Sequence, residues 1–167
     1  MGEAMREIVL LPARLEDAER LAELRAEALF DSLNRLGRYD ERRVRERFYS
    51  SFEPQYTKII EADGAFAGCA ALKPSREPQG EGGQEEQGWL LEHFYLTGDM
   101  RGRGIGAEVL RRLLEIAAEN PAPVRLNVLQ GSPARSLYER FGFETYSEDE
   151  VDVYMVLRPS RLHTLQA

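Results

Sequence analysis

The 167-residue chain has the length of a single domain, and its composition, 43% hydrophobic and 31% charged, excludes global disorder. Its 22 lysine and arginine residues against 29 aspartate and glutamate residues give a net charge of −7, which argues against nucleic-acid and anionic-membrane partners. The one cysteine, Cys69, cannot form an internal disulfide, and two histidines argue against a metal site. No apolar targeting or membrane-spanning segment is apparent, so we expect a soluble, cytoplasmic protein without a metal.

The first part of the chain predicts one strand, two helices and a hairpin. An apolar run over residues 5–11 predicts the strand. Apolar residues at helical spacing begin at Leu15, and again near Asp40, where valine and phenylalanine recur at every fourth position. Two strands follow around the dipeptide Asp63-Gly64, because these residue types supply the positive φ angles of a tight turn.

Two segments are expected to lack regular structure. Residues 74–88 contain no apolar side chain and are rich in Pro, Gly, Gln and Glu. Such a segment is too polar to be ordered by burial, so it is predicted to form a flexible loop between strands. The last ten residues, 158–167, are predicted to form a loose tail.

The second half predicts a strand, a helix, a strand, another helix and a final hairpin. These elements are expected at 89–96, from Ala107 to before Pro121, at 124–130, from Pro133 to Phe141, and between Phe143 and Leu157. Ser132 is the expected N-cap of the second helix, and Gly142 fits the left-handed residue that ends it. The order β-α-α-β-β-β-α-β-α-β-β is typical of a single α+β domain spanning residues 1–167.

The glycine-rich segment 101–106, RGRGIG, carries the clearest chemical signal. It lies between a predicted strand and a predicted helix, where glycines let the backbone approach a ligand and the helix N-terminus offers unpaired N–H groups. Arg101 and Arg103 add positive charge. The pattern indicates a phosphate or pyrophosphate ligand, although a glycine-rich turn with surface arginines has the same sequence.

Two common phosphate-binding motifs fit poorly. A P-loop requires Lys and then Ser or Thr after its glycines, whereas Gly106 is followed by Ala107 and Glu108. The spacing Gly102-x-Gly104-x-x-Ala107 matches the loose dinucleotide fingerprint, but the next strand ends without the acidic residue that would bind the ribose. A dinucleotide-dependent oxidoreductase is therefore the weaker alternative.

Three motifs together resemble the GCN5-related N-acetyltransferase (GNAT) family. They are Arg101-x-x-Gly104-x-Gly106 after FYL, Ala134-x-x-x-Tyr138 and Gly142-Phe143. The order of elements agrees as well, and the similarity extends from residue 5 to about residue 157. The resemblance implies a mixed, mostly antiparallel twisted sheet with helices on both faces, and acetyl-CoA as the acetyl donor and co-substrate.

The resemblance also implies where the donor binds. Its pyrophosphate would lie on the amides of residues 102–106, and its pantetheine would pair with the strand edge at Tyr95 and Leu96, in a slot where strands 89–96 and 124–130 splay apart. The family often has Asn where this chain has Gly131, so Ser132 is a candidate for the missing polar contact. The implied donor-binding residues are Tyr95, Leu96, Arg101, Gly102, Arg103, Gly104, Ile105, Gly106, Ser132 and Ala134.

Three residues are candidates for proton transfer. Tyr138 matches the family's general acid, because a phenol stays protonated at neutral pH and can donate to the departing thiolate. Glu92 is the first choice and His93 the second for the base; they are adjacent on one strand, so only one should face the cleft. A backbone N–H near Tyr95 would hold the oxyanion. The alternatives are a core tyrosine, a solvated glutamate and a half-buried histidine.

The acceptor stays open at this stage. An arginine-rich segment from Arg35 to Arg47 favours a carboxylate, whereas the acidic last hairpin, 144–152, favours a cationic amine, and both could be solvated faces. Cys69 is expected in the core, so no covalent enzyme intermediate is implied. We expect an N-acetyltransferase acting on a primary amine of a small molecule or peptide by direct attack, with a non-catalytic acyl-CoA-binding module as the alternative. The oligomeric state, a homodimer included, is not specified.

Overall fold

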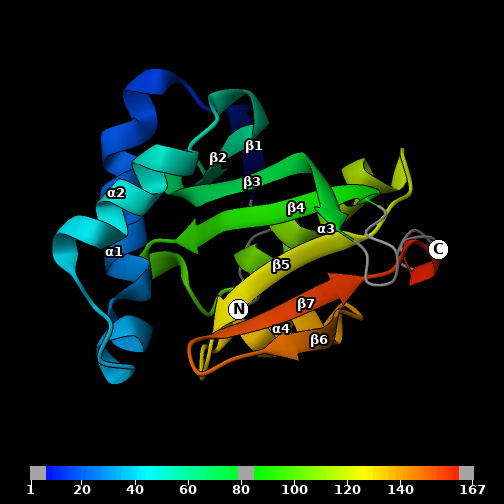
Figure 1. Cartoon of the computed structure of the whole chain (residues 1–167). Helices are drawn as coiled ribbons and strands as arrows, with labels where there is room; N and C mark the ends of the chain where they lie inside the picture. The colour runs from blue at the N-terminus through cyan, green and yellow to red at the C-terminus, as the bar shows by residue number, and fades with distance from the viewer. Residues whose placement is uncertain (1–6, 79–84, 162–167) are drawn as a thin grey trace. The chain divides into compact units, whose positions relative to one another are not determined.

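A computed structural model describes residues 7–78 and 85–161 (Figure 1). Seven strands form one open sheet in the order β1-β2-β3-β4-β5-β7-β6, and its described pairings are antiparallel except that of β4 with β5. The α+β class and the element order predicted from the sequence are therefore confirmed. In the part of the chain that the structure describes, no helix is long and apolar enough to cross a membrane.

The elements fall into two compact units. The first unit comprises Met1–Ala71 and His93–Val109, and the second comprises Leu72–Glu92 and Leu110–Ala167. The elements are β1 (Ile8–Pro12), η1 (Leu15–Asp17), α1 (Ala18–Arg35), α2 (Glu41–Ser51), η2 (Pro54–Tyr56), β2 (Thr57–Ala62), β3 (Ala65–Pro78), β4 (Glu85–Leu96), η4 (Gly98–Met100), α3 (Ile105–Ala118), β5 (Val124–Leu129), α4 (Ala134–Arg140), β6 (Glu144–Glu148) and β7 (Asp152–Leu157).

The core of the first unit lies between helices α1 and α2 and the sheet. The two helices run side by side (Figure 1), and Leu21 of α1 and Phe48 of α2 are fully buried. Burying a side chain of this size contributes about 1.5–3 kcal/mol. α2 begins next to Asp40, where a helix start was predicted, and Asp40 caps it by accepting hydrogen bonds from the Arg42 and Arg43 amides. These hydrogen bonds, chiefly the one from the Arg43 amide, hold the pKa of Asp40 below its ordinary value.

The β2–β3 hairpin confirms the turn predicted at Asp63-Gly64. Both residues have positive φ angles, 52° and 82°. The side chain of Asp63 also accepts a hydrogen bond of 2.8 Å from the amide of Glu7, which ties the turn to the start of β1. The turn therefore fixes the antiparallel register at Ala62↔Ala65 and Glu61↔Phe66, up to the register shift between Glu61 and Ile60.

Strands β3 and β4 approach unusually closely in the first unit. A Cβ atom placed on Gly68 would lie 2.0 Å from the Tyr95 carbonyl oxygen. The Thr97 amide donates a 2.9 Å hydrogen bond to Ala67 O next to this point. Glycine is therefore required at position 68 to admit the backbone of β4.

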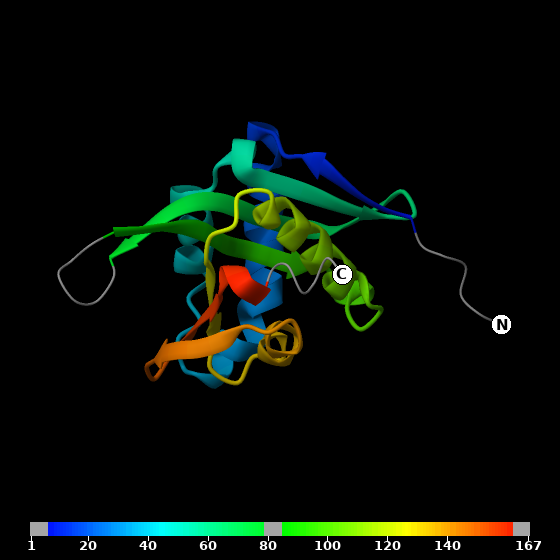
Figure 2. The ribbon, with the colours of Figure 1, turned by 90° about the vertical axis from the view of Figure 1, so that its right-hand side faces the viewer.

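In the second unit, β5, β7 and β6 form an antiparallel sheet with α4 lying against one face (Figures 1 and 2). Alternate residues of β7, namely Val153, Met155 and Leu157, are fully buried, whereas Tyr154 between them is partly exposed. The two-residue period shows that one face of this sheet forms the core. Gly142, with φ 97°, ends α4 as predicted.

Three predicted boundaries need correction. β3 continues to Pro78 and β4 begins at Glu85, so the strands include both ends of the expected loop 74–88. Backbone pairing can extend a hairpin beyond its core without apolar side chains, which is why composition alone misplaced the ends. Residues 79–84 lie outside the described residues.

The other two corrections concern the C-terminal part of the chain. α4 begins at Ala134, and Pro133 precedes it in helical conformation as the N-cap residue. Ser132 nevertheless accepts a hydrogen bond of 3.2 Å from the Ala134 amide, so its capping role is retained one residue further out. In the predicted tail, residues 159–161 form a helical turn, and residues 162–167 lie outside the described residues.

We predict that Gly68→Ala destabilises the protein by about 3 kcal/mol, because the new Cβ collides with main-chain atoms that cannot rotate away. Chemical denaturation with urea measures the change. Gly98→Ala is the matched control, since a Cβ there would meet only the Glu27 side chain at an ordinary 3.5 Å. Equal stabilities of the two variants would contradict the close approach of β3 and β4.

We also predict that the Cys69 thiol is unreactive in the folded protein. Cys69 is fully buried, and burial raises its pKa to about 12, so at pH 8 only about one molecule in ten thousand carries the thiolate. Ellman's reagent should leave the native protein unlabelled and label one thiol per chain in guanidinium chloride. Stoichiometric labelling of the native protein would show that Cys69 is accessible.

Candidate active site

The glycine loop connects the end of β4 to α3 through the short helix η4. Gly102 and Gly104 have φ angles of 73° and 81°, and no atom lies within 4 Å of a Cβ built on either. Glycine is therefore needed here for its backbone conformation rather than for space. The Arg101 Nε–H donates a 3.1 Å hydrogen bond to Leu96 O, which ties the loop back to β4.

The start of α3 is anchored in the core, while the loop that precedes it is exposed. Ile105 and Val109 are buried to 1% and 0% exposure, whereas Arg101, Gly102 and Arg103 are exposed. The first helical hydrogen bond runs from the Glu108 amide to Gly104 O, at 3.2 Å. The amides ahead of it have no partner within the helix, so the loop presents N–H groups and two guanidinium groups to an anion.

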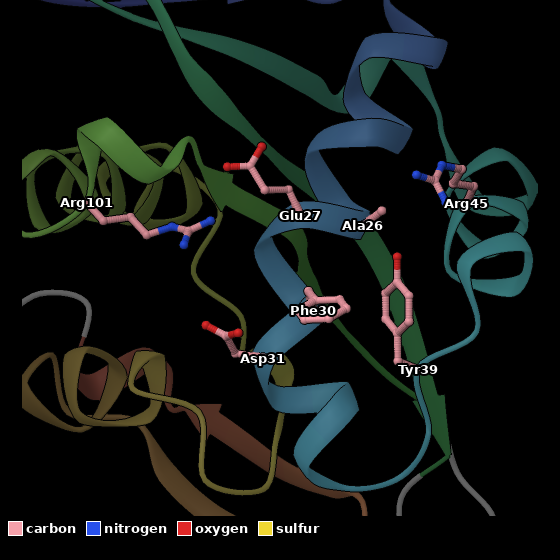
Figure 3. Close-up of a pocket in the computed structure, with 7 residues that line it drawn as sticks. All are labelled: Ala26, Glu27, Phe30, Asp31, Tyr39, Arg45 and Arg101. Carbon is pink, nitrogen blue, oxygen red and sulfur yellow. The ribbon is translucent and has the colours of Figure 1, made fainter.

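A cavity of about 400 Å³ lies beside this loop in the first unit (Figure 3). Its lining comes from α1, the α1–α2 connection, α2 and the glycine loop: Ala26, Glu27, Phe30, Asp31, Tyr39, Arg45 and Arg101. The rings of Phe30 and Tyr39 meet edge to face with their centroids 4.8 Å apart. Arg45 pairs with Glu23, and that hydrogen bond is the main reason why the pKa of Glu23 lies below its ordinary value.

Two carboxylates in the cavity wall have no such partner. Glu27 and Asp31 lie one helical turn apart on α1 (Figure 3), and among the residues that the structure describes neither makes a hydrogen bond or ion pair. Unpaired carboxylates four residues apart repel each other and favour a cation between them. The sequence analysis did not identify this cavity, because its residues are spread over more than 70 positions.

His93 interrupts the regular backbone of β4. Its φ angle of 49° lies in the left-handed region, and its ring lies 4.7 Å from the Phe48 ring, centroid to centroid. Its Nε2 atom is 2.6 Å from Ser51 Oγ, and its Nδ1 atom is 3.2 Å from the Tyr95 hydroxyl. Strict alternation of Glu92 and His93 requires an extended backbone at both residues, which His93 lacks, so their expected orientation on opposite faces stays a prediction.

The main chain of Tyr95 is occupied on the β3 side. Its carbonyl lies over Gly68, and its amide hydrogen-bonds the Cys69 thiol, an effect that partly opposes the burial that raises the thiol pKa. Successive strand amides point in opposite directions. By this alternation the amides that point away from β3 are those of Phe94 and Leu96, so of the expected edge residues Tyr95 and Leu96 it is Leu96 whose amide is directed away from β3.

In the second unit, Glu92 forms an ion pair of 2.8 Å with Lys73 of β3, and both side chains are about one-fifth exposed. Glu92 is thus neither fully solvated nor deeply buried. A carboxylate that exchanges a proton with a substrate needs such partial exposure. The ion pair of Lys73 with Glu92 was not predicted, because the sequence between the two strands does not indicate which residues of β3 and β4 lie opposite each other.

Tyr138 belongs to the core of the second unit. It is 6% exposed, and its ring meets Phe143 edge to face at 5.6 Å. This packing agrees with a core tyrosine, and it is also compatible with a general acid, since a buried ring can still present its hydroxyl to a cleft. Ala134 lies at the start of the same helix, next to the Ser132 hydroxyl described above.

The two charge clusters are largely engaged within the chain. On α2, Arg42 pairs with Glu46 one turn on. In the last hairpin, Asp149 accepts hydrogen bonds from the Val151 and Asp152 amides, and Asp152 accepts one from Asn127. Much of this charge therefore stabilises local structure, as solvated faces do.

Solved structures with the same fold include several acetyltransferases. The PaiA N-acetyltransferase from Thermoplasma acidophilum, in complex with coenzyme A, has a TM-score of 0.68 at 20% identity, covering 93% of this chain and 99% of that one. NAA60 from Arabidopsis thaliana, in complex with a bisubstrate analogue, has a TM-score of 0.63 at 18% identity, covering 90% and 98%. These likenesses confirm the fold.

A third structure is longer than this chain. The GCN5-related N-acetyltransferase from Anabaena variabilis has a TM-score of 0.61 at 17% identity, with 83% of this chain matched to 32% of that one. The chain thus spans about a third of that protein. None of the curated proteins compared matches the chain.

The family assignment comes from the sequence itself. Residues 18–143 match the family model described as the acetyltransferase (GNAT) family, a range that includes the glycine loop, β4 and all of α4. The resemblance in the three motifs is therefore confirmed, and the chain belongs to the acetyltransferase (GNAT) family.

Proposed function

We propose that the protein transfers the acetyl group of acetyl-CoA to a primary amine of a small molecule or peptide, by direct attack through a tetrahedral intermediate. The observation that carries this proposal is the left-handed glycine loop at the start of α3 in a chain of the acetyltransferase family. The complexes of PaiA with coenzyme A and of NAA60 with a bisubstrate analogue support it by analogy.

The glycine loop fits the donor's pyrophosphate. The amides of residues 102–106 lie at the N-terminus of a 14-residue helix, and the side chains of Arg101 and Arg103 add positive charge. Gly102 and Gly104 leave the approach to these amides open. Local charge therefore favours a polyphosphate although the whole chain is acidic.

The edge of β4 fits the pantetheine and the thioester. We assign the amide of Leu96 to the pantetheine and that of Phe94 to the carbonyl oxygen that becomes the oxyanion, because the Tyr95 amide faces Cys69. A preorganised backbone N–H is well suited to stabilise such an oxyanion. Ser132 and Ala134 are assigned to further pantetheine contacts.

Tyr138 is the proposed general acid for the thiolate, and Glu92 is the proposed base for the amine. The hydrogen bonds of His93 argue against it as the base, because both of its ring nitrogens already contact other side chains. Glu92 is held in an ion pair with Lys73. We therefore propose that the proton of the amine reaches the Glu92 carboxylate through a bound water.

The acceptor is proposed to be cationic before it reacts. The carboxylates of Glu27 and Asp31 and the rings of Phe30 and Tyr39 line the cavity beside the loop, together with Arg101 and with Arg45, whose charge is paired with Glu23. Two carboxylates beside aromatic rings suit an ammonium group. This cavity supports the amine side of the reaction more strongly than the arginines of α2 support a carboxylate.

We predict amine-dependent release of coenzyme A from acetyl-CoA. A panel of amines, amino acids, polyamines, peptides and amine antibiotics is screened with a thiol reagent, to which buried Cys69 contributes no background. Binding of coenzyme A without thiol release for any amine would favour a non-catalytic acyl-CoA-binding module. Thermal stabilisation by NAD(P) and not by acetyl-CoA would overturn the proposal.

A matched pair of glycine variants tests the loop within this experiment. Gly104→Ala should weaken thermal stabilisation by acetyl-CoA, because an alanine at φ 81° costs about 1 kcal/mol in the conformation that binds. Gly37→Ala changes a residue with a similar φ of 70° in an open turn and should leave that stabilisation unchanged.

We predict that Tyr138→Phe lowers kcat by about 100-fold and that Glu92→Gln does the same. Phenylalanine retains the packing against Phe143, so full turnover of Tyr138→Phe at every pH would assign Tyr138 to the core alone.

A further inference from the structure

A continuous hydrogen-bond chain runs through the first unit beside β4. The Arg25 Nε–H donates to the Tyr95 hydroxyl at 3.0 Å, and this hydroxyl lies 3.2 Å from His93 Nδ1. His93 Nε2 lies 2.6 Å from Ser51 Oγ. Three elements, namely α1, β4 and the last residue of α2, are thus joined through side chains that are all partly buried.

The contacts of this hydrogen-bond chain favour one tautomer of His93. We assign the one hydroxyl proton of Ser51 to Arg47 O, at 3.0 Å, so Ser51 Oγ accepts from His93 and the His93 proton lies on Nε2. The Tyr95 oxygen accepts from Arg25, so its own proton is available to His93 Nδ1. The donors in these contacts then each have an acceptor when His93 is neutral with its proton on Nε2.

Both ends of the chain stop at carbonyl oxygens of α2. Arg25 Nη1 donates to Val44 O at 2.6 Å, and Ser51 donates to Arg47 O. A carbonyl oxygen cannot pass a proton on, so these two ends of the hydrogen-bond chain do not relay one. Its effect is to hold α2, α1 and β4 together around the His93 ring, which also packs on Phe48.

The position held in this way is conformationally strained. A histidine at φ 49° leaves the extended backbone, and such residues persist where the surroundings determine them. The main chain of His93 is held as well, because its carbonyl oxygen accepts from Cys69 Sγ at 3.2 Å. The residue immediately after His93 is Phe94, whose amide is assigned above to the oxyanion.

Resting on the proposed acetyl transfer, we propose that Ser51, Arg25 and Tyr95 are positioning residues that hold the His93 side chain, and through it the β4 backbone at Phe94, in the geometry needed for the tetrahedral intermediate. His93 is then neither acid nor base. It is the residue through which α1 and α2 set the direction of the amide at position 94.

Two adjacent serines provide the test. Ser50 and Ser51 both donate to Arg47 O at 3.0 Å, but only Ser51 contacts His93. Ser51→Ala should therefore lower kcat by about tenfold, the effect of losing one positioning hydrogen bond, with KM for acetyl-CoA unchanged. Ser50→Ala should match the wild type, and Ser51→Thr, which retains the hydroxyl, should recover most of the activity.

A spectroscopic measurement tests the chain without relying on activity. The protein contains two histidines, His93 and His163, so ¹⁵N-detected imidazole spectra can be assigned with a His163→Gln variant. The wild type should show neutral His93 protonated on Nε2, and Ser51→Ala and Tyr95→Phe should each give a mixture of tautomers. Ser50→Ala should leave the spectrum unchanged.

The outcomes are distinguishable. A wild type that releases no thiol with any amine would refute the proposed function, while the spectra would still decide whether the chain fixes His93. His93 protonated on Nδ1, or on both nitrogens, at pH 7.5 would refute the hydrogen-bond arrangement proposed for His93. A normal spectrum for Ser51→Ala, or equal kcat values for Ser51→Ala and Ser50→Ala, would overturn the positioning role.

Discussion

The conformation of β4 from His93 to Tyr95 is the constraint on which the rest of the candidate site depends. On one side Gly68 admits the Tyr95 carbonyl, and Cys69 bonds the main chain of both residues. On the other side, α2 holds the His93 ring through Ser51. A left-handed residue costs about 1–3 kcal/mol and a neutral hydrogen bond returns about 1 kcal/mol, so several bonds are needed to retain this backbone.

The glycine loop depends on the same strand. β4 ends at Leu96, whose carbonyl oxygen accepts from Arg101, and the chain then turns through two left-handed glycines into α3. The buried side chain of Ile105 fixes where the helix begins. A shift in β4 would therefore move the amides of residues 102–106 as well, which links donor binding to the packing of the first unit.

The sequence predicted what depends on local patterns and missed what depends on pairing at long range. Asp40, Asp63 and Gly142 act within a few residues of themselves, so residue type was enough to place them. Ser51 and His93 are 42 positions apart, and Arg25 and Tyr95 are 70 apart. Nothing in the local sequence of β4 indicates a left-handed histidine, because the residues that hold it lie on other elements.

The charged residues also divide into those with a partner nearby in the sequence and those without one. Arg42 and Asp149 each have partners within four residues, so their charges stabilise a helix and a turn and give no information about a substrate. Glu27 and Asp31 have no such local partner, and they line a cavity with aromatic rings beside the donor loop. In a chain of net charge −7, these two carboxylates rather than the total charge are the basis of the proposed cationic acceptor, because no group among the described residues pairs with them.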